Sequence, residues 1–299
     1  MAYRLALATG AATLVLVLAG GLVTNTGSAL AVPDWPTTFG HNMFLYPWSG
    51  MVGGVFYEHS HRLLGSVVGL LTLALAAALW PAGGALRALG VVAAAAVVLQ
   101  GVLGGLRVVL LEQTLAILHG CLAQAFFALV CVIALRASPA AARPLAPGAA
   151  DPGVRRLALG AAGVTYAQIV LGALLTHAGW LELHLAGALA VYALVPIATA
   201  RLRRTGDPVA APVAGALLAA LGLQLLLGVG ALAARLAPAA LPEGALLALP
   251  VAHRVAGSLI VGAAAVLAAR VVRAPRRADL VALPGRPSAT LAASRGAAR

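Results

Sequence analysis

Charged residues are scarce in this sequence of 299 residues: they make up 9% of it, against about 25% in an average soluble domain. Hydrophobic residues make up 62%, so the composition excludes an ordinary soluble protein and favours an integral membrane protein. Lysine is absent, which we attribute to genome composition rather than to chemistry. The formal net charge of +12 does not indicate nucleic acid as a partner, because the arginines are scattered between apolar segments.

Cysteine is also rare. Cys121 and Cys131 fall inside one apolar segment, so they indicate neither a disulfide framework nor a redox compartment. The N-terminal stretch MAYRLALATGAATLVLVLAGG has no small-residue cleavage site followed by a soluble domain. We therefore expect it to be a retained first helix rather than a signal peptide.

Long apolar runs dominate what is present. A helix needs about 20 mostly apolar residues to cross the hydrocarbon core of a bilayer. Such runs lie near residues 5–24, 61–80, 88–110, 114–135, 157–176, 182–200, 209–234 and 250–272. The predicted fold is an all-α integral membrane protein with eight transmembrane helices, arranged as two similar four-helix bundles.

The expected organisation has four parts. Residues 1–136 form an N-terminal half and residues 157–273 a C-terminal half. Residues 137–156, rich in Pro, Ala and Arg, form a flexible cytoplasmic linker between the halves. Residues 274–299 form a disordered cytoplasmic tail.

The distribution of arginines predicts the orientation. With the N-terminus in the cytoplasm, most arginines fall on the cytoplasmic side. The outer side then holds only Arg62, Arg107, Arg235 and Arg254. By the positive-inside rule, both termini face the cytoplasm of a cell membrane, which we take to be bacterial or archaeal.

Four of the seven histidines open the even-numbered helices, and they are His61, His119, His184 and His253. They are therefore expected at one membrane depth, two in each half. A single histidine at a helix end is usually interfacial, but four at matched depth are hard to explain that way. The surrounding sequence repeats, because HRLLGS (61–66) matches HRVAGS (253–258) and LHGCLA (118–123) resembles LHLAGA (183–188).

The odd-numbered helices repeat too. A glutamine is followed four residues later by a glycine in the pairs Gln100 and Gly104, Gln168 and Gly172, and Gln224 and Gly228; the first helix ends in LAGG. Two interpretations stay open for these glycines: they make room for a flat macrocycle, or they let helices pack closely.

Haem ligation is the chemistry that suits this pattern. Two neutral imidazoles from two helices can approach an iron from both faces. Zinc or copper sites normally add Cys or carboxylate ligands and cluster more tightly. Arg62 and Arg254 directly follow two of the candidate ligands, and they either pair with haem propionates or reach lipid headgroups.

Glu58 makes the two halves of the chain chemically different. It lies three residues before His61 and shares a helix face with it, whereas Glu182 stands two residues before His184 and points elsewhere. One half thus has a carboxylate beside its histidine pair. We expect the remaining histidines, His41, His59 and His177, to be loop or interfacial residues.

Taken together, these motifs resemble the haem A synthase family. The matching pieces are GGLVTNTGSALAVPDWPTTFG (20–40), EHSHRLLGS, QGVLGGLRV (100–108), LHGCLAQAFF, LHLAGA and AHRVAGS. The resemblance implies oxidation of the C8 methyl of haem O to a formyl group, giving haem A, by successive hydroxylations and loss of water. It also implies that such a protein serves the assembly of cytochrome oxidase.

The resemblance also implies roles for individual residues. His184 and His253 would ligate a bound haem b, and His61 and His119 would flank the substrate haem. Glu58 would act beside them as an acid/base or charge-stabilising group. Some members of the family carry a cysteine pair in the first outer loop, but residues 25–57 contain no cysteine here.

The expected partners are the lipid bilayer, the farnesyltransferase that makes haem O, an electron acceptor of unspecified chemistry and a second copy of the chain in a homo-oligomer. The main alternative is a transmembrane di-haem electron carrier of the cytochrome b type, with permanent haem at both pairs. A transporter is the third interpretation. It predicts polar groups near the membrane centre, whereas here they crowd the outer ends.

Overall fold

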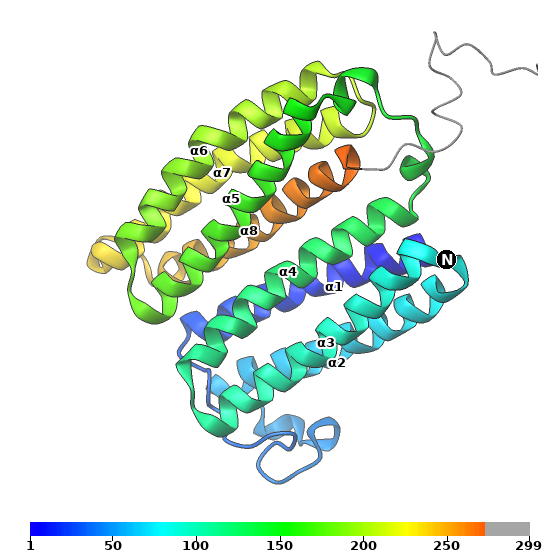
Figure 1. Ribbon diagram of the computed structural model, residues 1–299. Helices are drawn as coiled ribbons and strands as arrows, with labels where there is room; N and C mark the ends of the chain where they lie inside the picture. Colours follow the sequence, from blue (N-terminus) through cyan, green and yellow to red (C-terminus); the bar gives the residue numbers. More distant parts are fainter. Residues whose placement is uncertain (273–299) are drawn as a thin grey trace, which may run out of the picture.

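The structure, a computed structural model, describes residues 1–272; the predicted tail at 274–299 lies outside the described residues. Eight long helices make up most of this part of the chain (Figure 1). They are α1 (Ala2–Asn25), α2 (Gly53–Leu79), α3 (Gly84–Leu110), α4 (Gln113–Ala137), α5 (Pro152–Ala178), α6 (Leu181–Arg204), α7 (Ala210–Leu236) and α8 (Glu243–Val271). Each is long and apolar enough to cross a membrane, which confirms the predicted all-helical fold with eight spans.

Helices α1–α4 lie together on one side of the molecule and α5–α8 on the other (Figure 1). Each set has its own cluster of buried side chains, including Leu75 and Ile133 in the first and Leu217 and Leu267 in the second. Helices α1, α4, α5 and α8 make the contacts between the sets. The expectation that the sets are two similar bundles stays a prediction.

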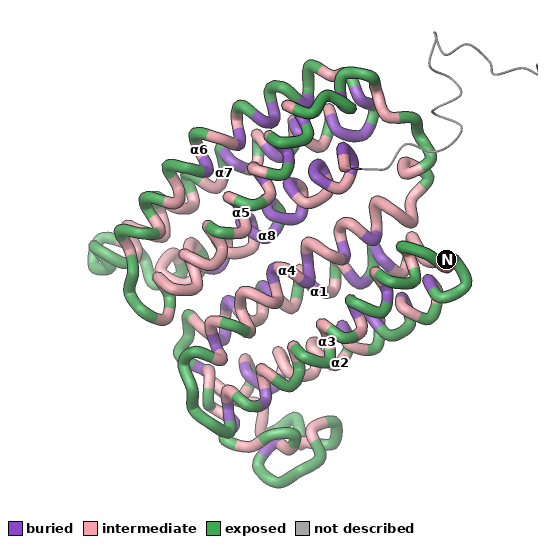
Figure 2. Tube along the Cα trace, viewed as in Figure 1, coloured by how far each residue is buried: buried purple, intermediate pink, exposed green. Residues whose placement is uncertain are grey.

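The outward faces of the helices are apolar. Leu70, Leu189 and Leu226 are 69%, 74% and 71% exposed, although they lie in the middle of long helices. In Figure 2 exposed positions follow the outward sides of the helices, and buried positions follow the sides that face other helices. A surface of this kind is unfavourable in water and suits the hydrocarbon core of a bilayer.

Two helices begin earlier than the apolar runs indicate. Helix α2 begins at Gly53 instead of residue 61, and α8 begins at Glu243 instead of residue 250. His61 and His253 therefore lie two to three turns inside their helices, and the expectation that they sit in the first turn or two is wrong. In α2 the reason is a set of contacts between residues distant in sequence, because the polar residues before His61 find partners in the loop between α1 and α2.

A buried ion pair lies at the end of the molecule opposite the α1–α2 loop. Nη2 of Arg270 in α8 lies 2.8 Å from Oδ2 of Asp207 in the α6–α7 connection, and the two side chains are 2% and 0% exposed. Arg270 also donates to the carbonyls of Arg143 and Pro144 in the α4–α5 connection, and Asp207 accepts from three backbone N–H groups. Burial alone would raise the pKa of Asp207, but these hydrogen bonds outweigh burial and hold it at about 2.

We expect Asp207→Ala to lower the free energy of unfolding by about 3 kcal/mol, because the buried Arg270 loses its counter-charge. The folded-state pKa lies below the ordinary value of 3.8, so this contribution is complete above about pH 4 and is lost as the pH falls towards 2. Thermal unfolding of the purified protein in detergent, measured across this pH range, tests both statements. Asp151→Ala, which removes the exposed N-cap of α5, is the control; an equally large loss there would contradict the special role of Asp207.

Candidate haem site

Two pairs of histidines face each other, one pair in each set of helices. The rings of His61 in α2 and His119 in α4 have centroids 6.4 Å apart, with an angle of 72° between their planes. The rings of His184 in α6 and His253 in α8 have centroids 6.3 Å apart, with an angle of 70°. The structure thus brings together the four histidines that the sequence singled out, in two nearly identical arrangements.

The ring spacing fits an iron between two imidazoles. An imidazole nitrogen binds a metal at about 2.0 Å and lies about 1.1 Å from its ring centre, so two axial imidazoles place their centres about 6.2 Å apart. Both observed spacings agree with this value. In residues 1–272 no group of three or more His, Cys, Asp or Glu side chains is placed to hold a metal ion.

A glycine on the preceding helix packs against each histidine ring. A Cβ added at Gly20, Gly104, Gly172 or Gly228 would lie 3.1, 3.2, 3.4 or 3.1 Å from Cε1 of the histidine on the next helix. The rings therefore rest against the backbones of α1, α3, α5 and α7. These four glycines serve close helix packing, and that packing fixes the position of each ring.

His119 shows which ring nitrogen is available to a metal. Its Nδ1 lies 3.2 Å from the main-chain oxygen of Gln100, and Nε2 of Gln100 donates back to the His119 carbonyl at 2.8 Å. A carbonyl oxygen only accepts, so Nδ1 carries the proton and Nε2 keeps its lone pair. An N–H held by a backbone carbonyl is the usual support for a metal-ligating histidine.

Glutamines at the equivalent positions contact the histidines of the other half. Nε2 of Gln168 donates to the His184 carbonyl at 2.9 Å and lies 3.2 Å from Nδ1 of the same ring. Nε2 of Gln224 lies 3.2 Å from Nε2 of His253. Several polar atoms around the rings are buried and have no hydrogen-bond partner among residues 1–272; they include Nδ1 of His61 and His253 and Oε1 of Gln100, Gln168 and Gln224. Buried polar atoms are normally satisfied, so this surround suits a site with a further occupant.

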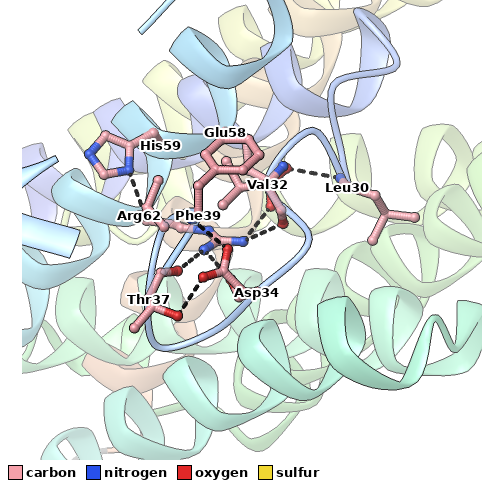
Figure 3. A network of polar contacts seen from close by, with 9 residues as sticks. Leu30, Val32, Asp34, Thr37, Phe39, Glu58, His59 and Arg62 are labelled. Carbon is pink, nitrogen blue, oxygen red and sulfur yellow. Dashed lines mark hydrogen bonds and ion pairs between the residues drawn. The ribbon is translucent and has the colours of Figure 1, made fainter. Parts of the chain in front are cut away.

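Glu58 is engaged by the α1–α2 loop. Its side chain is buried, Oε2 accepts from the backbone N–H groups of Leu30 and Val32 at 2.9 Å, and Oε1 lies 2.8 Å from Nη2 of Arg62 (Figure 3). The carboxylate thus has a structural task that sequence reasoning missed, because its partners lie 26 and 28 residues away along the chain. A catalytic role for Glu58 stays a prediction.

Arg62 completes this contact. Its guanidinium donates to the carbonyls of Val32, Asp34 and Thr37 at 2.7 to 3.1 Å (Figure 3). Asp34 in turn accepts from the Thr37 hydroxyl and from the N–H groups of Phe39 and Gly40. Burial alone would raise the pKa of Asp34, but these hydrogen bonds hold it at about 2. We call Glu58, Arg62 and Asp34 with their loop partners the loop knot. A role for Arg62 in binding propionates stays a prediction.

The loop also covers other residues of this region. His59 is 1% exposed, its Nδ1 lies 3.1 Å from the Thr38 hydroxyl, and its ring lies 5.2 Å from that of Tyr46. The expectation that His59 is a loop or interfacial residue is therefore wrong: it lies in α2, and its ring is held under the loop. Trp35 packs so closely on Gly105 of α3 that any larger side chain there would overlap its ring.

Arg254 lies where the two halves meet. It follows His253 in α8, and its Nη1 lies 3.3 Å from the hydroxyl of Thr24 at the end of α1. Its Cδ is 3.8 Å from the position a Cβ would take at Gly21, next to the glycine that supports His61. Arg254 is thus a cation between α8 and the end of α1, next in the chain to His253, and its use for propionates stays a prediction.

The sequence comparisons agree with this geometry. Residues 47–181 match the family model COX15-CtaA, described as cytochrome oxidase assembly protein. Over this segment, which is less than half of the chain, the protein is similar to that family, the haem A synthase family. No curated protein matches the chain.

The segment that matches the haem A synthase family holds part of the site. It includes Glu58, His61, Arg62 and His119, and it ends at the first residue of α6. His184 and His253 lie beyond it, so their assignment depends on the ring geometry and on the repeated sequence around them.

The glycine contacts lead to a test. We expect Gly104→Ala to reduce haem retention severalfold, because the new Cβ lies 3.2 Å from Cε1 of His119 and displaces the ring by a few tenths of an ångström. Gly101→Ala, one turn earlier in α3, adds the same methyl where nothing lies within 4 Å. Haem content per chain, from the absorbance of purified protein, should fall only in the first variant. An equal loss in both would show that helix propensity, not ring position, is responsible.

The loop knot leads to a second test. We expect Glu58→Gln and Arg62→Gln to raise the rate of chymotrypsin cleavage within the α1–α2 loop at least tenfold, because each removes charged hydrogen bonds to the loop backbone. Unchanged cleavage in both variants would contradict the knot. Haem conversion by the same two variants separates the roles of Glu58, since a loss much larger in Glu58→Gln than in Arg62→Gln indicates chemistry beyond holding the loop.

Proposed function

We propose that the protein is a haem A synthase, which oxidises the C8 methyl group of haem O to a formyl group. Two findings support this together. In both halves the spacing of the histidine rings would suit an iron between them, and residues 47–181 match the family model. The family match alone indicates only a role in cytochrome oxidase assembly. The ring spacing is the observation that carries the haem chemistry.

The two pairs take different tasks in this proposal. His184 and His253 hold a resident haem b, and His61 and His119 flank the substrate haem O. When bound, haem b supplies one-electron redox chemistry. The protein supplies the ligand nitrogens, and the glycines and glutamines of the odd-numbered helices orient them.

The reaction converts a methyl group to a formyl group, which is a four-electron oxidation. Two hydroxylations give a geminal diol, and loss of water from the diol leaves the aldehyde. With water as the oxygen source, the electrons pass to an acceptor and the protons leave the site. Glu58 is the carboxylate nearest in sequence to His61, and the proposal gives it a proton-accepting or charge-stabilising task in addition to its place in the loop knot.

Location and partners follow from the same proposal. The apolar outer faces support a multi-pass protein of the cell membrane, and the arginine distribution supports an orientation with both termini in the cytoplasm. The farnesyltransferase that forms haem O is the donor of the substrate. Arg254, which follows His253 and reaches the end of α1, is suited to a haem propionate.

A di-haem electron carrier is the second candidate, and one observation favours it. The two pairs have almost the same ring spacing and ring angle, as two permanent haem sites would. The surroundings of the pairs differ, however, because the loop knot is attached to the helix of His61. That asymmetry favours the enzyme.

Expression in cells that make haem O but no haem A tests the proposal. We expect extraction and chromatography to yield haem A or hydroxylated haem O. Cells expressing His119→Ala from the same vector serve as the control. Two molecules of haem b per chain without any new haem would instead support the electron carrier.

A further inference from the structure

Exposed arginines gather at one end of the α5–α6 hairpin. Only Gly179 and Trp180 join the two helices, so the start of α5 and the end of α6 lie at the same end of the molecule (Figure 1). The α4–α5 connection packs there as well, because a Cβ added at Gly148 would lie 3.6 Å from Cα of Thr205. The exposed arginines at this end, which we call the arginine cluster, are Arg155, Arg156, Arg201, Arg203 and Arg204.

The side chains of the arginine cluster have no ion-pair or hydrogen-bond partner within residues 1–272. Two carboxylates lie at this end, and both are engaged elsewhere. Asp207 is paired with Arg270, and Asp151 accepts from the backbone N–H groups of Gly153 and Val154. The end of the hairpin therefore carries an excess of positive charge that the protein itself does not neutralise.

Exposed aliphatic side chains lie one helical turn from the arginines, towards the middle of the membrane span. Leu159 follows Arg155 by four residues, and Ile197 precedes Arg201 by four residues. Residues four apart share a face of a helix. Each of these two faces thus presents a guanidinium group at the helix end and an apolar surface next to it.

The helix dipole does not account for the whole arginine cluster. Cations are favoured at the C-terminal end of a helix, and the last turn of α6 carries three of the arginines. They are disfavoured at the N-terminal end, where Arg155 and Arg156 lie in α5. The positive-inside rule explains an excess of arginines on one side of the membrane, but it does not require them to cluster on two neighbouring helices.

The arginines of α1–α4 at the same end of the molecule differ from the cluster. Nε of Arg87 donates to the Trp80 carbonyl at 2.9 Å, and its guanidinium carbon lies 5.0 Å from the centre of the Trp80 ring. Nη2 of Arg136 donates to the carbonyl of Ala269 at 3.2 Å. Arg4 is exposed and stands apart from other arginines in the sequence. Unengaged positive charge is thus concentrated on the C-terminal half.

We propose that the arginine cluster binds the headgroup of an anionic phospholipid. Guanidinium groups hold the phosphate, and an acyl chain lies along the exposed faces that carry Leu159 and Ile197. An acidic protein would use the charges but not these apolar faces, which favours the lipid. The inference goes beyond the proposed function and does not depend on any haem chemistry.

Native mass spectrometry of the full chain in an uncharged detergent tests this proposal. The protein, depleted of lipid, is titrated with phosphatidylglycerol or with phosphatidylcholine that carries the same acyl chains. We expect phosphatidylglycerol to bind at least tenfold more tightly. An arginine near an anionic surface contributes roughly fivefold to binding. The double variant Arg203→Gln/Arg204→Gln and the double variant Arg155→Gln/Arg156→Gln should therefore each bind phosphatidylglycerol about twentyfold more weakly and phosphatidylcholine as before.

A matched variant controls for net charge. Arg4→Gln/Arg235→Gln also removes two exposed arginines, one in the other half and one at the opposite end of the hairpin α7–α8, and should bind phosphatidylglycerol like the unmodified protein. Glycerol 3-phosphate, which has the charge of the headgroup but no acyl chains, should not displace the lipid at equal concentration. The melting temperature of each variant without lipid checks that it is folded.

Three outcomes overturn the proposal. Equal affinity of the unmodified protein for both lipids would show that the cluster does not recognise an anionic headgroup. Equal weakening in Arg4→Gln/Arg235→Gln would show that net charge alone attracts the lipid. Displacement by glycerol 3-phosphate would show that the site takes a free anion. If one double variant of the cluster does not fold, the other decides, and unchanged binding there overturns the proposal.

Discussion

The contact of a histidine ring with a glycine on the neighbouring helix is the constraint on which this architecture depends. A side chain at Gly20, Gly104, Gly172 or Gly228 would push the ring away from the backbone that positions it. The ring and the glycine belong to consecutive helices, so each helix hairpin fixes the position of its own histidine ring. Pairing of the hairpins then brings two rings to a spacing of about 6 Å in each half, which suits a two-imidazole iron site.

This arrangement places the candidate iron ligands and the glycines that contact them on rigid helices. The four rings come from long helices, and their supports come from the helices beside them. The α1–α2 loop adds a cover on one side through the backbone contacts of Glu58 and Arg62. Buried Asp207 and Arg270 join the connections at the opposite end, so the helix ends are tied together on both sides of the membrane-spanning region.

Sequence reasoning found the spans and the four histidines because both depend on local patterns. An apolar run of sufficient length is a span whatever it packs against, and a Gln-x-x-x-Gly or His-Arg repeat is visible without coordinates. The start of α2 was missed because the polar residues of EHSHR read as a loop. Their partners are backbone groups of residues 30–37 and the side-chain hydroxyl of Thr38, and no local pattern reveals such contacts. His59 was misjudged for the same reason.

The loop knot gives the protein a cover whose closure does not depend on oxidising conditions. Hydrogen bonds from Arg62 to three carbonyls, and from two backbone N–H groups to Glu58, hold a loop that contains no cysteine. A thiol reductant would leave this cover unchanged. Bonds of this kind also break and re-form without an oxidant or a reductant.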